Sequence, residues 1–480
     1  MKKLKCRTLL ASGLIVAGSA SAQTSDIDQL KATVEQLQKT IQEQNARILQ
    51  LEKAKTGTPP PTRTTPAVPA TPAETGTPPG SLTTVTPAGQ QAPVPYRQTL
   101  KDEQEAAPRA GDLIMDPKYQ GYMLVPNTPV IIRFNAKPRV DFTYDLQNAG
   151  NDDRFVTAHI PVDGDPFKGG DGVFNINAKG SQLRLDVRAP EFRGSPRFYY
   201  ENDFFGSGGG EFPYRIRHLY GQIFNIIVGQ TYSVFEDPDV WPDTVDYEGP
   251  NSAVFVRRPL ARYQLPLSKE WHLNFGLEQP SAEVDTSIDP DARSVNHAPD
   301  GGINVRWERD KVGHVQLAGM ARDIGVRGPI VGDQSVLGWG LNLSSSMNVF
   351  GKDSVQGQVT YGEGIFRFSN DDFFNNDAAF DSSGDMEALP YLGVMFGYTH
   401  QWTDNWRSTV SYGYVNLDNA ASQAPDAYHE THYASANVIY KLTRRLSIGL
   451  EGLYGTKEVK SGADGDVWRI QAGLVYWLWE

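Results

Sequence analysis

From residue 130 to the C-terminus the sequence alternates apolar and polar residues in runs of about ten, and this alternation restricts what the chain can form. In one such run Val140, Phe142, Tyr144 and Leu146 are separated by charged or hydroxyl-bearing residues. Period two is the period of a β-strand, in which successive side chains point to opposite faces. Strands with one apolar and one polar face are typical of outer-membrane β-barrels, although a soluble sandwich gives the same alternation.

The connections between these runs distinguish the two architectures. Tight turns are predicted near 190–195, 225, 266–269, 309–312, 351–353, 403–405 and 443–445, and long loops at 147–172, 205–213, 234–250, 281–300, 324–334, 365–389, 418–427 and 458–465. Short turns at one rim and long loops at the other are typical of an outer-membrane barrel. These fifteen connections predict an all-β fold, a 16-stranded antiparallel transmembrane β-barrel.

Four segments are predicted before the barrel. Residues 1–22 have a basic start, an apolar stretch and Ala20-Ser21-Ala22, the features of a secretory signal peptide. Residues 23–55 carry apolar residues at three- and four-residue spacing, which predicts an N-terminal helical coiled coil whose a and d positions favour a dimer. Residues 56–95 are rich in Pro and Thr and predict a disordered linker. Residues 96–129 lead to the barrel, which is expected to span 130–480.

Composition narrows the function classes. Mean hydropathy is −0.44, and no run of about 18 apolar residues follows the leader, so no helix is expected to cross a membrane. Loss of the leader removes four positive charges and the single cysteine, Cys6, and moves the formal net charge from −12 to −16. An acidic exported chain without cysteine is expected to form no disulfide and to bind no nucleic acid.

The stretch 214–265 carries a charge pattern that indicates a pore. Arg215 and Arg217 are two apart and share one face of a predicted strand, as do Arg258 and Arg262 on a later strand, whereas Arg257 has the opposite, outward parity. The acidic loop 234–250 lies between these strands. Its carboxylates are Glu236, Asp237, Asp239, Asp243 and Asp246. If the loop folds into the barrel, these acids face the arginine wall and form a charged constriction. The alternative is that the charges pair with each other and only hold the loop.

Motifs in this stretch resemble the DcaP-like porins of the bacterial outer membrane. The motifs are Arg215-Ile216-Arg217-His218-x-Tyr220-Gly221, Val228-Gly229-Gln230-Thr231-Tyr232-Ser233, Asp237-Pro238, Val245-Asp246-Tyr247-x-Gly249-Pro250 and Phe255-Val256-Arg257-Arg258-Pro259. The resemblance implies a homotrimer of sixteen-stranded barrels in outer-membrane lipid, with a periplasmic coiled coil. It also implies passive passage of small anionic solutes such as dicarboxylates. We expect this trimer rather than the dimer favoured by the heptads, because barrel contacts should dominate a short coil.

Two other functions are kept as alternatives. A sugar-type porin needs a ladder of aromatic residues along the lumen, and an outer-membrane enzyme needs a Ser or Asp beside a His near a rim; neither grouping stands out. We therefore expect a channel and not an enzyme.

No cofactor or metal site is predicted. The acids of the sixth long loop are favoured as a hydrated external surface, because their spacing matches no calcium loop. They are Asp371, Asp372, Asp377, Asp381 and Asp385. The last aromatic residues, Trp477 and Trp479 among them, are predicted at the membrane interface.

Overall fold

The computed structural model describes residues 121–170, 172–208, 210–371 and 376–478. The predicted signal peptide, coiled coil and linker lie outside these residues, as does most of the segment 96–129. The first long strand begins at Ile131, next to the predicted start of the barrel at residue 130. In the part of the chain that is described, no helix is long and apolar enough to cross a membrane.

Strands make up most of the described residues. The first eleven are β1 (Met123–Leu124), β2 (Ile131–Lys137), β3 (Arg139–Asp145), β4 (Val173–Asn177), β5 (Gln182–Arg188), β6 (Arg197–Asp203), β7 (Arg215–Ile223), β8 (Ile226–Tyr232), β9 (Arg257–Pro266), β10 (Trp271–Glu278) and β11 (Arg293–Val295). The others are β12 (Asp300–Arg309), β13 (Gly313–Gly328), β14 (Gly332–Val349), β15 (Asp353–Glu363), β16 (Ala378–Phe380), β17 (Met386–Ala388), β18 (Pro390–Gln401), β19 (Trp406–Leu417), β20 (Tyr428–Lys441), β21 (Leu446–Val459) and β22 (Asp464–Tyr476). Between residues 121 and 478, the described parts of the chain contain three short 3-10 helices in loops: η2 (Thr157–His159), η3 (Pro238–Val240) and η4 (Phe366–Phe368).

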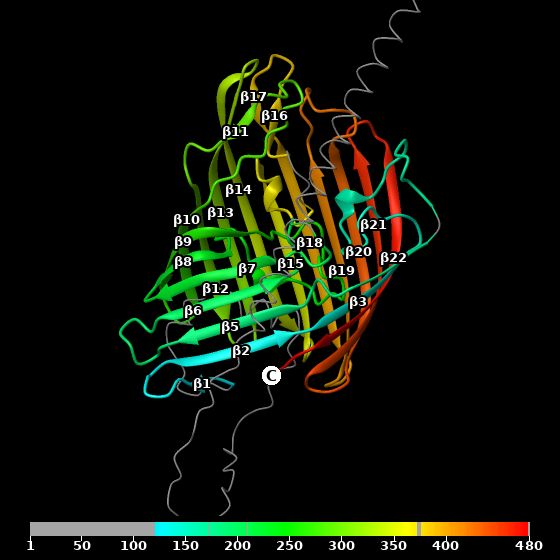
Figure 1. Ribbon diagram of the computed structural model, residues 1–480. Coiled ribbons are helices and arrows are strands. Elements are labelled where there is room, and N and C mark those ends of the chain that lie inside the picture. Colours follow the sequence, from blue (N-terminus) through cyan, green and yellow to red (C-terminus); the bar gives the residue numbers. More distant parts are fainter. Residues whose placement is uncertain (1–120, 171, 209, 372–375, 479–480) are drawn as a thin grey trace, which may run out of the picture. The chain divides into compact units, whose positions relative to one another are not determined.

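Antiparallel pairing closes the main sheet into a barrel. Consecutive long strands from β5 to β22 pair as neighbours, with β11 and the separate β16–β17 hairpin lying in loops. The last strand, β22, pairs with β3, while β2 pairs with β5 and so joins the two ends of the sheet. Figure 1 shows β2, β5, β6 and β7 side by side on one part of this wall. Pro138 separates β2 from β3, since proline has no N–H to give to a ladder.

The strand faces are inverted relative to those of a soluble protein. On β14, Leu341 and Leu343 are 51% and 52% exposed, whereas Asn342 and Ser344 are 0% and 1% exposed. Exposed apolar and buried polar side chains alternate in this way when a barrel has lipid outside and a polar interior. The predicted period-two alternation is therefore confirmed, with the apolar set facing outward.

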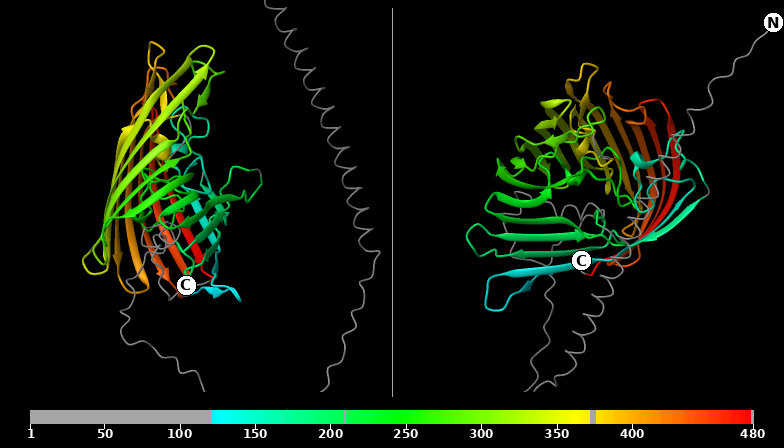
Figure 2. Two further views of the ribbon diagram at one scale, coloured as in Figure 1. Left: turned by 90° about the vertical axis from the view of Figure 1, so that its left-hand side faces the viewer. Right: turned by 45° about the horizontal axis from the view of Figure 1, so that its top comes forward.

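The predicted tight turns are confirmed, but the predicted long loop at 324–334 is wrong. There β13 and β14 continue to Gly328 and Gly332 and stay paired, which leaves a connection of only three residues. The extended hairpin is stabilised because Ile324 and Val326 pack with Val284 and Phe380 from neighbouring loops. The predicted loop 458–465 is likewise shortened, to residues 460–463. Figure 2 shows the long, yellow-green strands β13 and β14 running side by side in its left-hand view.

The C-terminal aromatics do not all face the membrane. Tyr476 is 40% exposed, whereas Trp477 is 6% exposed. The Trp477 ring centre lies 5.0 Å from both Lys137 Nζ and Arg184 Cζ. Trp477 therefore packs against basic side chains inside the barrel, because it takes the inward parity at the end of β22. Trp479 lies outside the described residues.

Candidate functional site

The connection between β8 and β9, residues 233–256, runs along the inner wall of the barrel, and we call it the inner loop. Amide side chains that point inward from the wall hold its first residues. Asn304 Nδ2 donates to the Val234 carbonyl at 2.7 Å, and Asn342 Nδ2 donates to the Phe235 carbonyl at 3.0 Å. A Cβ at Gly302 would lie 3.0 Å from Val234 Cβ, so glycine makes room for this close approach. The loop backbone, which lacks a strand partner here, is satisfied by the wall.

Two of the predicted loop acids, Asp237 and Asp239, bind a different arginine from those expected. Arg306 on β12 donates to Asp237 Oδ1 at 3.0 Å and to Asp239 Oδ2 at 2.7 Å. His314 Nε2 lies 2.8 Å from Asp237 Oδ2, and Ser344 Oγ donates to the same oxygen at 2.6 Å. Burial raises the pKa of Asp237, but the charges of His314 and Arg306 lower it by more than burial raises it. The pKa of Asp237 is therefore well below the ordinary value. These charge-assisted contacts anchor the start of the inner loop.

Two more loop acids are also held by the wall or by the loop itself. The Val256 N–H donates to Glu236 Oε2 at 2.9 Å. Asp243 forms an ion pair with Arg407 of β19, and Asn437 Nδ2 donates to the Asp243 carbonyl at 2.8 Å. The inner loop is thus fixed on β12 at one end and on β19 and β20 further along.

Asp246 is held by backbone N–H groups and lies beside a second carboxyl group, that of Glu451. The Asp246 carboxylate accepts the N–H groups of Gly249 and Phe155 at 2.9 and 3.3 Å, and its own N–H donates to Glu451. Burial raises the pKa of Asp246 to about 6, although the charge of Arg469 opposes the rise. This carboxyl group therefore changes charge in mildly acidic solution.

Arg215 and Arg217 lie on one side of β7, as the sequence predicts, and both bind Asp203. Their distances to Asp203 Oδ2 are 2.6 and 3.3 Å, and Arg217 Nε donates to Glu201 at 2.6 Å. The register with β6 shifts by one residue at this point, which is a β-bulge that leaves Arg217 as the extra residue. The carboxylates that bind these arginines come from β6 and not from the inner loop.

Arg258 and Arg262 share the inward face of β9 but do not meet the loop acids in ion pairs. Arg258 binds Asp300 at 2.6 Å, and Arg322 Nε lies 3.4 Å from the same oxygen of Asp300. Arg262 donates to the carbonyl of Tyr232. Arg258 is therefore part of a buried ion-pair network in the wall.

Arg257, which has outward parity in the sequence, packs against inward residues. Its guanidinium carbon lies 4.2 Å from the ring centre of Phe255, and its Nε donates to His218 Nε2 at 3.3 Å. Because it stands at the first position of β9, beside the inner loop, the strand parity does not fix its direction. The predicted arginine set is thus divided among separate partners.

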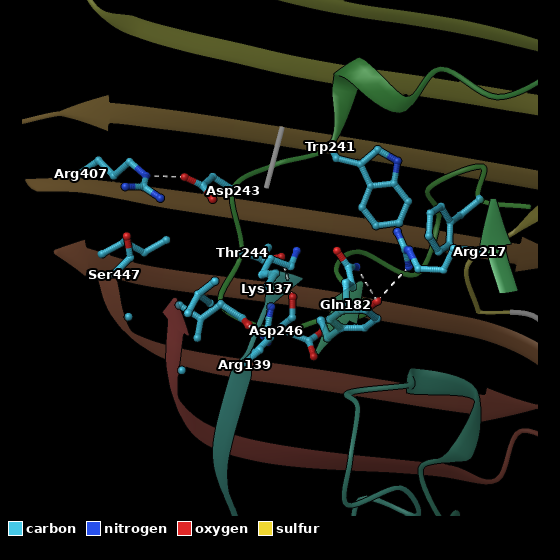
Figure 3. Close-up of a pocket in the computed structure, with 17 residues that line it drawn as sticks. Lys137, Arg139, Gln182, Arg217, Trp241, Asp243, Thr244, Asp246, Arg407 and Ser447 are labelled. Carbon is cyan, nitrogen blue, oxygen red and sulfur yellow. Dashed lines mark hydrogen bonds and ion pairs between the residues drawn. The ribbon is translucent and has the colours of Figure 1, made fainter. Parts of the chain in front are cut away.

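A pocket lies between the inner loop and the barrel wall (Figure 3). Its lining consists of Lys137, Arg139, Gln182, Arg217, Trp241, Asp243, Thr244, Val245, Asp246, Tyr247, Phe255, Arg407, Ile439, Ser447, Gly449, Gly473 and Val475. Figure 3 shows Lys137, Arg139 and Gln182 gathered beside the segment that carries Thr244 and Asp246. We call this the basic pocket, because its charged groups are four cations and two carboxylates.

Of the four cations in the basic pocket, sequence reasoning identified only Arg217. Arg139 belongs to the polar set of its strand, so parity places it inward, and Lys137 stands on the other side of Pro138. Arg407 lies far along the chain, and nothing in its local sequence indicates a partner in the inner loop. A basic pair around a proline that interrupts a barrel strand is the signal that could have identified Lys137 and Arg139.

The predicted hydrated surface of the sixth long loop is wrong for Asp371 and Asp377, which are 1% and 0% exposed because each binds buried partners. Asp371 accepts hydrogen bonds from Thr157, Tyr428 and Thr431, and Asp377 binds Arg322 at 2.7 Å. Within the described ranges, no group of three or more His, Cys, Asp or Glu residues is arranged to hold a metal ion.

We compared the sequence and the structure with those of known proteins. The sequence matches the family described as DcaP outer membrane protein over residues 124–476. No curated protein matches the chain. Its structure resembles the crystal structure of the outer membrane channel DcaP of Acinetobacter baumannii, with a TM-score of 0.65 and 20% identity, over 74% of this chain and 99% of that one. It also resembles an anion-selective porin from Comamonas acidovorans, with a TM-score of 0.47 and 13% identity, over 73% and 100% of the two chains. The first likeness shows a shared fold.

Proposed function

This chain belongs to the DcaP outer membrane protein family, and from that premise we propose that it is a porin, a passive channel for small hydrophilic solutes. We propose further that the channel prefers anions, dicarboxylates among them, and that the inner loop forms its constriction. The closed barrel, with polar side chains inside and apolar side chains outside, supports a water-filled path across the outer membrane.

We propose that sixteen strands span the membrane in this channel. The count takes β2 with β3 and β4 with β5 as one interrupted strand each, and omits the short strands β1, β11, β16 and β17. An even number brings both ends of the barrel to the rim with the short turns, which is periplasmic in proteins of this kind. The expected coiled coil would then extend into the periplasm, and the barrels would associate as the homotrimer that the family resemblance implies.

The lining of the basic pocket carries the proposed anion preference. The lining holds two carboxylates and four cations, Lys137, Arg139, Arg217 and Arg407. Of these cations, Arg139 also pairs with Asp141, and Arg217 with Glu201 and Asp203. Charges beside low-dielectric walls act more strongly on a passing ion than the same charges in bulk water. Guanidinium groups also suit carboxylates, which they can bind through two parallel hydrogen bonds.

The predicted site residues divide between two proposed roles. We assign Arg215 and Arg217 to the passage, next to the basic pocket. The loop acids Asp237 and Asp239 hold the constriction in place through Arg306. Arg258, in its ion-pair network, stabilises the wall.

A reversal potential tests the proposed preference. The trimer is inserted into a planar lipid bilayer with a KCl gradient, and the zero-current potential is expected to have the sign of an anion-preferring channel. Lys137→Gln should move this potential toward the cation side, because Lys137 lies in the basic pocket. Lys352→Gln is the matched control, since Lys352 is an exposed lysine at a turn, paired with Asp404 at 2.6 Å. A cation-preferring wild-type channel would contradict the proposal.

A further inference from the structure

The phenol of Tyr247 connects the inner loop to strands β5, β6 and β7 of the wall. Its hydroxyl donates to Asp203 Oδ2 at 2.8 Å. The hydroxyl oxygen of Tyr247 accepts hydrogen bonds from Arg217 Nη1 at 2.8 Å and Gln182 Nε2 at 3.2 Å. These three partners lie on β5, β6 and β7, so a single side chain reaches three neighbouring strands.

The Tyr247 ring also covers charged groups of the wall. The guanidinium carbons of Arg139 and Arg217 lie 5.2 and 5.7 Å from its ring centre, within the range of cation–π attraction. Phe205, from the connection between β6 and β7, lies 4.7 Å from it, centre to centre. Arg217 is 2% exposed, whereas Tyr247 itself is only half-buried and lines the basic pocket. A solute in the pocket therefore meets the Tyr247 ring as the more exposed of these two lining side chains.

The inner loop around Tyr247 has other anchors, so this side chain is not needed to keep the loop in place. Arg139 donates to the Val245 carbonyl, and Arg154 binds Glu248 at 2.8 Å. Asn370 Nδ2 donates to the Glu248 carbonyl at 2.6 Å. The neighbours of Tyr247 on both sides are thus tied to the barrel or to another loop by their own contacts.

We propose that Tyr247 is a specificity-determining residue of the channel. It spans the gap between the inner loop and β5–β7 and limits the size of the anions that pass. This inference rests on the proposed porin function. Burial raises the pKa of the Tyr247 phenol, so the hydroxyl stays protonated and remains a donor to Asp203.

Two substitutions separate the contributions of the ring and the hydroxyl. Tyr247→Ala removes the ring, so the single-channel conductance should rise and gluconate should gain permeability relative to chloride. Tyr247→Phe keeps the ring but loses all three hydroxyl hydrogen bonds, so it should raise the current noise of the open channel while leaving the gluconate-to-chloride ratio near that of the wild type. Insertion of stable trimers into the bilayer checks that each variant is folded, and the Phe variant keeps the test available if the Ala variant does not assemble.

Tyr398→Phe is the matched control for the hydroxyl. Tyr398 also donates to a carboxylate, Asp353, at 2.7 Å, but it lies on the outward face of β18, where adjacent Thr399 points inward. This variant should have wild-type noise and permeability. If both Tyr247 variants match the wild type while Lys137→Gln still shifts the reversal potential, the role of Tyr247 is refuted and the porin proposal stands. If wild-type protein in the bilayer carries no current, the proposed function itself fails.

Discussion

Replacement of Arg306 by glutamine should release the start of the inner loop from the barrel wall. Arg306 is the arginine that binds both Asp237 and Asp239, at 3.0 and 2.7 Å. It also binds Glu308 on its own strand at 2.9 Å. Glutamine keeps most of the length of the side chain and one pair of donors, but it cannot neutralise the carboxylates. The variant therefore removes charge pairing from the anchor while leaving the β12 backbone in place.

The expected loss follows from the burial of the three groups. The Arg306 side chain is 11% exposed and its two loop partners are 0% and 2% exposed. Removal of one partner from a buried ion pair costs about 3–5 kcal/mol. Asp237 keeps His314 and Ser344, so the lower value, about 3 kcal/mol, applies here. At 1.4 kcal/mol per tenfold, the docked state of the loop should lose a factor of about 100 against the released state.

Single-channel recording and amide hydrogen exchange measure this release. Arg306→Gln should show larger fluctuations of the open-channel current and faster exchange of the N–H groups in residues 234–240. Arg309→Gln is the control on the same strand, because Arg309 is 57% exposed and pairs only at the surface with Glu270. The reasoning is refuted if Arg306→Gln and Arg309→Gln give the same current noise and the same exchange rates as the wild type.

Three further outcomes are expected. The pKa of Asp246 is raised from 3.8 to about 6, so this carboxyl group contributes stability below pH 4 that is lost as the pH rises through 6. Because the group gains a negative charge over the same range, the anion preference, measured as the reversal potential, should fall from pH 5 to pH 7.5. The Asp246→Asn variant should not show that change. Arg258→Met should lower the free energy of unfolding by about 3 kcal/mol, because Asp300 loses its 2.6 Å partner, while the reversal potential stays unchanged; thermal unfolding and bilayer recording together check this. Deletion of residues 23–95 should leave the trimer intact on a sizing column, because barrel contacts should outweigh the short predicted coil, and a monomer peak would contradict this.

The fold could be predicted because the lipid-facing side of a barrel imposes a period on the sequence itself. Leu341 and Leu343 must face lipid and Asn342 must face the interior, so the pattern can be read without knowing any partner. This pattern does not apply to the parts of the chain that extend beyond the membrane, where no lipid selects apolar residues on one face of a strand. The segment 324–334 contains glycines and charged residues and resembles a loop, but it continues as a hairpin because neighbouring loops cover Ile324 and Val326.

The site was harder to predict than the fold, because its contacts cross the barrel. Parity placed Arg215 and Arg217 on one side correctly, and both reach Asp203. The alternation of residues along a strand shows which side chains point inward, but it does not show which inward side chains contact the inner loop. Arg306 and Arg407 bind the inner loop from positions 67 and 164 residues away in the chain, and no local pattern marks them as its partners.

The positions of the loop acids determine how many negative charges line the basic pocket. The chain as a whole is acidic, with a formal net charge of −12, and a uniform distribution of that charge would repel anions. Asp237 and Asp239, however, are bound to Arg306 on β12, and neither belongs to the lining of the basic pocket. The lining keeps four cations and two carboxylates, and one of these carboxylates is Asp246, with a pKa of about 6. Since electrostatic interactions weaken with distance and with screening by salt, we propose that this local lining outweighs the distant acids and gives an acidic chain a preference for anions.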